Sequence, residues 1–209
     1  MTTYLYVILI TLMQISFANI QAMETDTNST SNSSANQLLD TAIITVDISE
    51  QKLYLRKENN ELVKTYDIST SKFGIGSKAY SNKTPLGWHH IENKIGADAP
   101  EGTIFKARQN TGKIAKINGE IGDLVTSRIM WLKGLDEGKN LGTGIDSYKR
   151  YIYIHGTAEE NKIGKRASHG CIRMLNRDVI ELFNLVKEKT KINIVMNQET
   201  IPSIEKPLE

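Results

Sequence analysis

An alternation of apolar and polar residues begins near Thr41 and predicts a run of short β-strands. Apolar positions recur at every second residue over 43–48 and 53–55, and Asn59-Asn60 predicts a turn before a third strand over 62–66. Further short β-like runs, separated by glycine-rich segments, lie at 88–91, 103–106, 128–132, 151–154 and 191–196. Many short strands predict a mainly β domain.

One segment has the period of a helix rather than a strand. After Asn176, which we expect to be the N-cap, the residues Val179, Leu182, Phe183 and Val186 fall on one helical face. Asp178 in the first turn and the lysines at 187 and 189 suit the two ends of the helix dipole. The pattern therefore predicts one or two short helices within the β domain.

The two ends of the chain differ in composition from this β region. Residues 1–22 hold no Asp, Glu, Lys or Arg and are largely apolar, which predicts an export signal cleaved after Ala18 or Ala22. An uncleaved anchor is the main alternative, and translation from Met23 is another; the apolar run is short against the roughly 20 residues that span a bilayer. Residues 23–40 form a Ser/Thr/Asn-rich stretch that we expect to be a disordered tether, and 198–209 a loose tail.

We expect residues 41–197 to form one domain, because a chain of 209 residues is long enough for one ordinary domain and too short for two domains with linkers. The net charge of +2 gives no sign of nucleic-acid binding. We expect contact with a membrane only through the N-terminal segment, if that segment stays uncleaved. The single cysteine excludes an internal disulfide, so Cys171 is either a buried apolar residue or a reactive thiol.

Histidine and glycine around that cysteine favour the reactive thiol. His155 ends a predicted strand, and Cys171 follows 16 residues later, enough for a loop to bring the chain back. A free thiol is largely protonated at neutral pH, so a nucleophilic cysteine needs a base such as His155. Gly170 and Cys171 are candidate backbone donors to an oxyanion, because a side chain at Gly170 would obstruct the substrate.

The stretch Ser168-His169-Gly170-Cys171-Ile172-Arg173-Met174, preceded by His155-Gly156-Thr157, resembles the signature of the L,D-transpeptidase catalytic domain. Thr84-Pro85-Leu86-Gly87 is similar to the family's upstream T-P-x-G element, and the resemblance runs from about Thr41 to Met196. It implies an L,D-transpeptidase-like β-sandwich. We find no wall-binding repeat beside the domain in this sequence. This favours an exported protein of a Gram-negative periplasm.

The resemblance implies acyl transfer on peptidoglycan stem peptides. Cys171 would attack the L-centre carbonyl of the third stem residue and release D-alanine, and an amine would resolve the thioester into a 3→3 cross-link. His155 would act as base and acid in turn, and the carbonyl of Gly156 would hold its tautomer. No metal or cofactor is required, and a wall-anchored lipoprotein is a further possible acceptor.

Three alternatives stay open. The same nucleophile would serve an L,D-carboxypeptidase or an amidase that detaches wall proteins. A zinc site built from His155, His169 and Cys171 is chemically reasonable. A domain that binds peptidoglycan without turnover is the non-enzyme alternative.

Roles for the neighbouring residues are also open. His169 is expected to shape the pocket, and Ser168 to cap the turn or donate a hydrogen bond to substrate. Arg173 would bind a donor carboxylate or form an internal salt bridge. Trp131 is expected in the core rather than under the substrate, and Gly134 to Ser147 is a candidate lid. Adjacent His89 and His90 would point to opposite faces of a strand, which argues against a metal pair.

Overall fold

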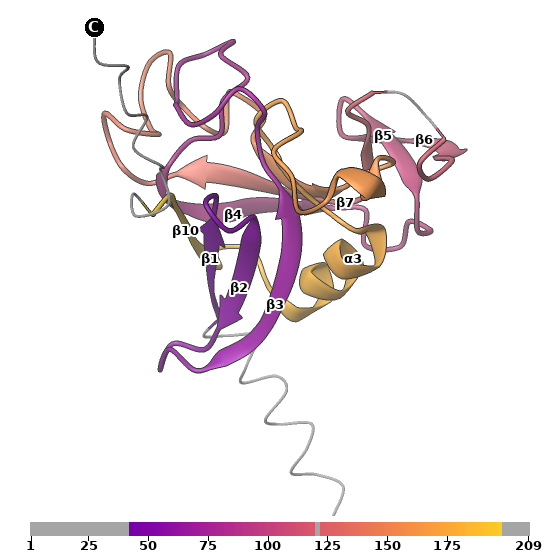
Figure 1. Cartoon of the computed structure of the whole chain (residues 1–209), viewed down its shortest axis with the longest axis horizontal. Coiled ribbons are helices and arrows are strands. Elements are labelled where there is room, and N and C mark those ends of the chain that lie inside the picture. The colour runs from indigo at the N-terminus through magenta and orange to yellow at the C-terminus, as the bar shows by residue number, and fades with distance from the viewer. Residues whose placement is uncertain (1–41, 120–121, 198–209) are drawn as a thin grey trace, which may run out of the picture. The chain divides into compact units, whose positions relative to one another are not determined.

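The computed structural model describes residues 42–119 and 122–197; the predicted signal, tether and tail lie outside them. Within these residues the chain forms one ten-stranded sheet, a short 3₁₀ helix η1 (Glu160–Lys162) and the helix α3 (Asn176–Leu185) (Figure 1). In chain order the strands are β1 (Ile43–Asp47), β2 (Lys52–Arg56), β3 (Leu62–Ser69), β4 (Gly87–Ile95), β5 (Thr103–Lys106), β6 (Gln109–Ile114), β7 (Val125–Gly134), β8 (Tyr153–Gly156), β9 (Ile172–Met174) and β10 (Lys191–Val195).

The sheet closes on itself. Its order is β4-β10-β1-β2-β3-β9-β8-β7-β5-β6, and β4 also pairs with β7. Eight strands therefore form a closed, barrel- or sandwich-like layer, and the hairpin β5–β6 extends from it. The predicted mainly β, sandwich-like fold is confirmed.

The length of β7 and an irregularity within it explain why the sheet both closes and extends. One end of β7 pairs with β5 at Val125 and Thr126, whereas Ile129 to Gly134 pair with β4. Between these halves the register shifts, and Ser127 has a left-handed φ of 61°. A bulge of this kind bends a strand, so one strand serves two neighbours on the same edge.

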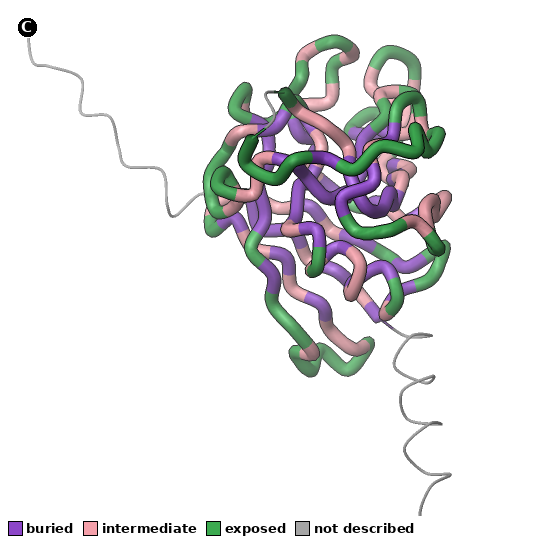
Figure 2. Tube along the Cα trace, turned by 90° about the vertical axis from the view of Figure 1, so that its right-hand side faces the viewer, coloured by how far each residue is buried: buried purple, intermediate pink, exposed green. Residues whose placement is uncertain are grey.

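Alternation in the first strands produces the core. Ile44 and Val46 of β1 and Leu53 and Leu55 of β2 are fully buried, while the residues between them are less so. They pack with apolar side chains of β8, β9, β10 and α3 in the main core, which Figure 2 shows as buried segments at the centre of the trace. α3 packs against β7 and β8.

The helix begins one residue earlier than predicted. Leu175, not Asn176, is the N-cap residue, and it makes no side-chain capping bond. The carboxylate of Glu160 accepts hydrogen bonds from the Asn176 backbone and side-chain nitrogens, both at 2.8 Å. The predicted N-cap role of Asn176 is wrong because a carboxylate distant in sequence satisfies the first amide.

Two strands, β6 and β9, lack the alternation of buried and exposed residues by which a strand is recognised in a sequence. All six residues of β6 are exposed, and all three residues of β9 are buried, so neither alternates. No helix in the described segments is long and apolar enough to cross a membrane.

Candidate active site on strands β8 and β9

The two motif segments meet as neighbouring parallel strands. In the register of β8 and β9, Ile154 lies opposite Ile172, and His155 opposite Arg173. Ile154 and Ile172 are fully buried in the main core. Because side chains alternate along a strand, His155, Cys171 and Arg173 share the other face. There Cys171 packs against a smaller cluster of Phe105, Ile129 and Tyr153.

His155 has a defined tautomer. Its side chain is buried, and Nδ1 lies 2.6 Å from the carbonyl oxygen of Gly156. A carbonyl only accepts, so Nδ1 carries the proton and Nε2 keeps its lone pair. Burial lowers the pKa of His155, against the charge of Asp123 and the bond to Gly156, which both raise it. The imidazole is thus a neutral base at neutral pH.

Gly156 is needed for close packing at this point. A Cβ on Gly156 would lie 2.5 Å from Oδ1 of Asn176 and 2.9 Å from the carbonyl oxygen of Thr126. Oδ1 of Asn176 accepts hydrogen bonds from the hydroxyls of Thr126 and Ser127, both at 2.6 Å. The side chain of Asn176 thereby connects α3 to β7 directly behind His155.

Cys171 contacts the backbone of the residues before His155. Sγ accepts a hydrogen bond from the Tyr153 amide and donates one to the Tyr151 carbonyl, each at 3.4 Å. Burial raises the pKa of Cys171 to about 12, and the Tyr153 amide and Arg150 only partly oppose it. At neutral pH Cys171 is therefore a neutral thiol, which would need a base to ionise.

Ser168 and Gly170 shape the turn that carries the cysteine. The buried Ser168 hydroxyl donates to the Cys171 carbonyl at 2.6 Å and accepts from the Gly170 amide at 3.2 Å. Of the two roles expected for Ser168, these are the contacts of a turn cap, and the hydroxyl hydrogen is already donated to Cys171 rather than left for a substrate. Gly170 has φ of +123°, a conformation that side chains rarely adopt. Its amide is already engaged, which leaves the Cys171 amide as the stronger oxyanion candidate.

The T-P-x-G element holds the same turn from the other side. Thr84 is buried, and its hydroxyl donates to the Gly170 carbonyl at 3.0 Å while accepting from the Ser71 amide at 3.1 Å. The two sequence elements quoted for the family thus meet at the cysteine turn, although 86 residues separate Thr84 from Gly170.

Arg173 forms an internal ion-pair network. Its side chain is 0% exposed, and Nη1 lies 3.0 Å from Asp123 Oδ1 and 2.9 Å from Glu159 Oε2. Nη2 donates to the Ser69 hydroxyl at 3.1 Å. Of the two roles left open for Arg173, the internal salt bridge is present, and direct contact with a substrate carboxylate does not fit a fully buried side chain.

Asp123 is a site residue that sequence reasoning missed. One of its carboxylate oxygens pairs with Arg173, and the other accepts from the backbone N–H and from Nδ1 of His169, both at 2.9 Å. Burial raises the pKa of Asp123, but electrostatic interactions with His155 and Arg173 and the hydrogen bonds from His169 outweigh it and hold the pKa below its ordinary value. Asp123 lies in a loop without periodicity or motif, so no local pattern marks it.

His169 lies at the edge of the site. Its side chain is 45% exposed, and its ring lies 5.5 Å from that of Phe73. The zinc alternative required His169 beside His155 and Cys171. Among the residues that the structure describes, no three His, Cys, Asp or Glu side chains are grouped to hold a metal ion.

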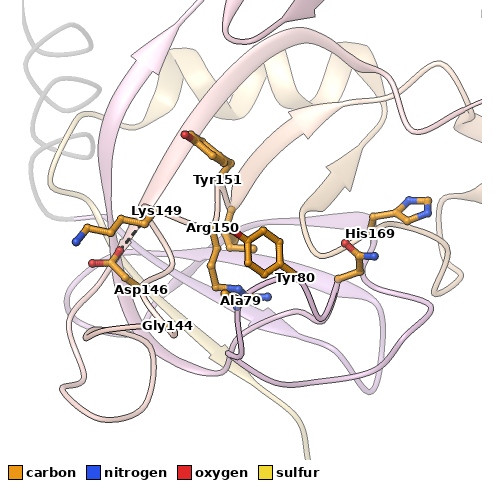
Figure 3. A pocket seen from close by; sticks show the side chains of 10 residues that line it. Ala79, Tyr80, Gly144, Asp146, Lys149, Arg150, Tyr151 and His169 are labelled. Carbon is orange, nitrogen blue, oxygen red and sulfur yellow. Dashed lines mark hydrogen bonds between the residues drawn. The ribbon is translucent and has the colours of Figure 1, made fainter.

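A cavity of 480 Å³ opens beside the cysteine turn (Figure 3). Its walls come from two segments: 79–82, before the T-P-x-G element, and 144–152, before β8, with His169 at one side. The candidate lid therefore contributes to this cavity. Buried Asn140 fastens that segment to β4 through bonds to the carbonyls of Leu86 and Trp88, at 2.9 and 3.0 Å.

Other residues singled out in the sequence have structural roles. His89 is buried and bonds to Ser147 at 2.9 Å, whereas His90 pairs with Glu92, so the two imidazoles do lie on opposite faces. Trp131 is only partly buried, and it stacks on Tyr148 with ring centroids 4.0 Å apart.

Fold and site together define a β-domain with a buried imidazole and a thiol on one face of adjacent parallel strands, beside an open cavity. The family model for the L,D-transpeptidase catalytic domain (YkuD) matches residues 41–194, and the chain belongs to this family. The family is one of enzymes acting on the cell wall, so membership implies an enzyme.

Shorter matches link the chain to curated relatives. It is 50% identical over 46 residues to a Bacillus licheniformis protein named "Putative L,D-transpeptidase YkuD". The aligned segment is 22% of this chain and 28% of the relative. A second relative, from Fuscovulum blasticum and also named as an L,D-transpeptidase, is 43% identical over 49 residues, 23% of this chain and 25% of its own length. The chain thus spans only about a quarter of the curated relatives that it matches.

A solved L,D-transpeptidase from Mycobacterium smegmatis is similar with a TM-score of 0.47 and 16% identity. The match covers 74% of this chain and 58% of that one.

Proposed function

We propose that this chain is an exported peptidoglycan L,D-transpeptidase, a cysteine acyltransferase with Cys171 as nucleophile and His155 as base. The observation that carries the proposal is the Nδ1 bond from His155 to Gly156, which leaves Nε2 unprotonated on the face that bears the thiol. Family membership supports the same reaction class.

In the first step Nε2 of His155 takes the thiol proton, and Sγ attacks the L-centre carbonyl of the third stem residue. The carbonyl π bond opens to an oxyanion. When it reforms, the bond to the nitrogen of the terminal D-alanine breaks, and that nitrogen takes the proton from His155. A thioester on Cys171 and free D-alanine result.

In the second step an amine of a neighbouring stem gives its proton to His155 and attacks the thioester. The C–S bond breaks, the proton returns to sulfur, and a 3→3 cross-link forms. Water in place of the amine would give a tripeptide, the carboxypeptidase outcome.

We assign the developing oxyanion to the backbone amide of Cys171, with Gly170 permitting the turn rather than donating. This follows from the Gly170 amide being bonded to Ser168. Gly156 orients the base, and His169 orients Asp123 at the edge of the site.

Export and the acceptor complete the proposal. The apolar residues 1–22 support passage to the envelope, where peptidoglycan stem peptides are found, in a periplasm if the cell is Gram-negative. A stem amine is the proposed acceptor; an amine of a wall-anchored lipoprotein would need the same thioester.

The test is mass-spectrometric product analysis of a disaccharide tetrapeptide mixed with the full chain, beside the Cys171→Ala variant. We expect loss of D-alanine and formation of dimers only with the intact cysteine. Tripeptides alone would indicate the hydrolytic alternative. No change in either sample would contradict tetrapeptide acylation.

A further inference from the structure

The cavity beside Cys171 holds a cation that lacks a counter-charge. Arg150 is half-buried, and its guanidinium donates to the carbonyls of Lys83 at 2.7 Å and Gly76 at 3.3 Å and to the Ser81 hydroxyl at 3.4 Å. All three acceptors are neutral. In the described segments, Arg150 pairs with no carboxylate, in contrast to Arg173, which pairs with two.

A partly buried cation without a carboxylate partner is a favourable place for an anion to bind. Burying a charge costs free energy unless the charge is paired, and burial lowers the pKa of Arg150. A guanidinium carries five N–H donors, and the bonds to Gly76, Ser81 and Lys83 leave the Nε–H and one Nη1–H for a ligand. Both Nη2 hydrogens are engaged, so each free donor would bind a carboxylate oxygen through a single charge-assisted hydrogen bond.

The rest of the lining favours an anionic ligand. Lys149 adds a second cation at the cavity, and among the residues that the structure describes Asp146 is the one carboxylate lining it. One oxygen of Asp146 already accepts from the amides of Tyr148 and Lys149, at 2.9 and 3.1 Å. The cavity therefore keeps a net positive charge beside the thiol.

Tyr80 gives the cavity an aromatic rim. Its side chain is 100% exposed, and its φ of 63° lies in the left-handed region, which is uncommon for residues other than glycine. The segment is held in place because the Ala79 amide donates to the Gly144 carbonyl at 2.7 Å. Figure 3 shows Tyr80 and Arg150 among the side chains that line the cavity.

Arg150 lies close enough to Cys171 for each side chain to influence the pKa of the other. The Tyr151 carbonyl that accepts from the Cys171 thiol belongs to a residue lining the cavity, and Arg150 precedes it in the chain. In a tetrapeptide donor the terminal carboxylate lies one residue beyond the carbonyl that Sγ attacks. A donor held at the thiol would thus place its terminal carboxylate one residue from the thiol, beside the cavity that Arg150 lines.

We propose that this cavity is the donor subsite for the C-terminal D-amino acid, and that the free Arg150 donors bind its carboxylate before that residue leaves. The inference rests on the proposed function and names the residue that selects peptides with a free C-terminus. It gives Arg150 the carboxylate role that the sequence suggested for Arg173.

The experiment compares a stem tetrapeptide with its C-terminal carboxamide as donors for the full chain. Released D-alanine or D-alaninamide is measured, and kcat and KM are determined separately. We expect the acid to be preferred by roughly 10- to 100-fold in kcat/KM, the effect of losing one charged hydrogen-bond pair. Arg150→Met should remove the preference, and Arg150→Lys should retain part of it.

Lys165→Met is the matched control, since Lys165 is an exposed cation in the loop before Cys171 that does not line the cavity. It should keep the full preference. Arg150 also holds the 76–83 segment, so thermal melting accompanies each variant, and the acid-to-amide ratio of the unmodified chain tests the subsite without any substitution.

Equal turnover of acid and amide by the unmodified chain would overturn the inference alone. So would a preference that persists in a folded Arg150→Met protein. If Arg150→Met slows both donors equally and also slows alkylation of Cys171 by iodoacetamide, Arg150 serves the thiol and not the carboxylate. Release from neither donor would overturn the proposed function together with this inference.

Discussion

Replacing Arg173 by methionine should destabilise the domain strongly. The change removes the cation that lies within 3.0 Å of both Asp123 and Glu159, and those carboxylates are themselves mostly buried, at 18% and 14% exposed. Breaking a buried ion pair by removing one partner costs about 3–5 kcal/mol, because the remaining charge is left uncompensated. For a domain of this size that corresponds to a fall in Tm of about 6–20 °C.

The assay is thermal unfolding followed by circular dichroism at pH 7. Arg177→Met is the control, because the Arg177 side chain is 78% exposed and its pair with Asp178 should contribute about 0–1 kcal/mol. Adding Asp123→Asn and Glu159→Gln to Arg173→Met should recover part of the loss, since no buried charge would then remain unpaired.

The two carboxylates that pair with Arg173 predict that the stability of the domain depends on pH. Burial raises the pKa values of Asp123 and Glu159, but cationic neighbours including Arg173 outweigh it, so both values are lowered on folding. Groups with lowered pKa values stabilise the fold above their unfolded values and lose that contribution as pH falls through the folded ones. The unmodified chain should therefore lose stability below about pH 4, and Arg173→Met should lose less over that range.

A different outcome would refute the internal role of Arg173. If Arg173→Met kept the Tm of the unmodified chain and instead raised KM for donors with a free carboxylate, Arg173 would be a substrate contact. Arg150 would then not be needed for carboxylate recognition.

Three further predictions concern the base, the nucleophile and the helix. Gly156→Ala should cost about 1–3 kcal/mol in urea unfolding and abolish turnover, because the added Cβ would lie 2.5 Å from Asn176 Oδ1; an active protein of unchanged stability would contradict this close approach. With the pKa of Cys171 raised to about 12 and that of His155 lowered, alkylation of the thiol by iodoacetamide should keep rising well above pH 8, and a plateau near pH 6 would indicate a preformed ion pair. Glu160→Ala should destabilise the domain by about 0.5–2 kcal/mol through loss of the bond to the first helical amide, and an unchanged Tm would remove Glu160 as the helix cap.

Local sequence patterns were sufficient for the strands that alternate and for the apolar face of α3, and they singled out Cys171 and His155, whose reactive roles stay predictions. Alternation works in β1 and β2 because one face of each strand is buried and the other is less so. It fails for β6, which is exposed on both faces, and for β9, which is buried on both. A sequence period exists only where the two faces differ.

What surrounds the nucleophile depended on the tertiary structure. Arg173 and Arg150 are both arginines near Cys171, and nothing local to either indicates which one meets a carboxylate. The closed sheet places Asp123 and Glu159 around Arg173, and it leaves Arg150 among backbone carbonyls at the edge of a cavity. The sequence alone was enough to predict Cys171 and His155 as the reactive pair, because a strand end and a glycine turn are local features. The partners of the charged side chains come from loops distant in the chain, so only folding could decide which cation is neutralised and which is left for a ligand.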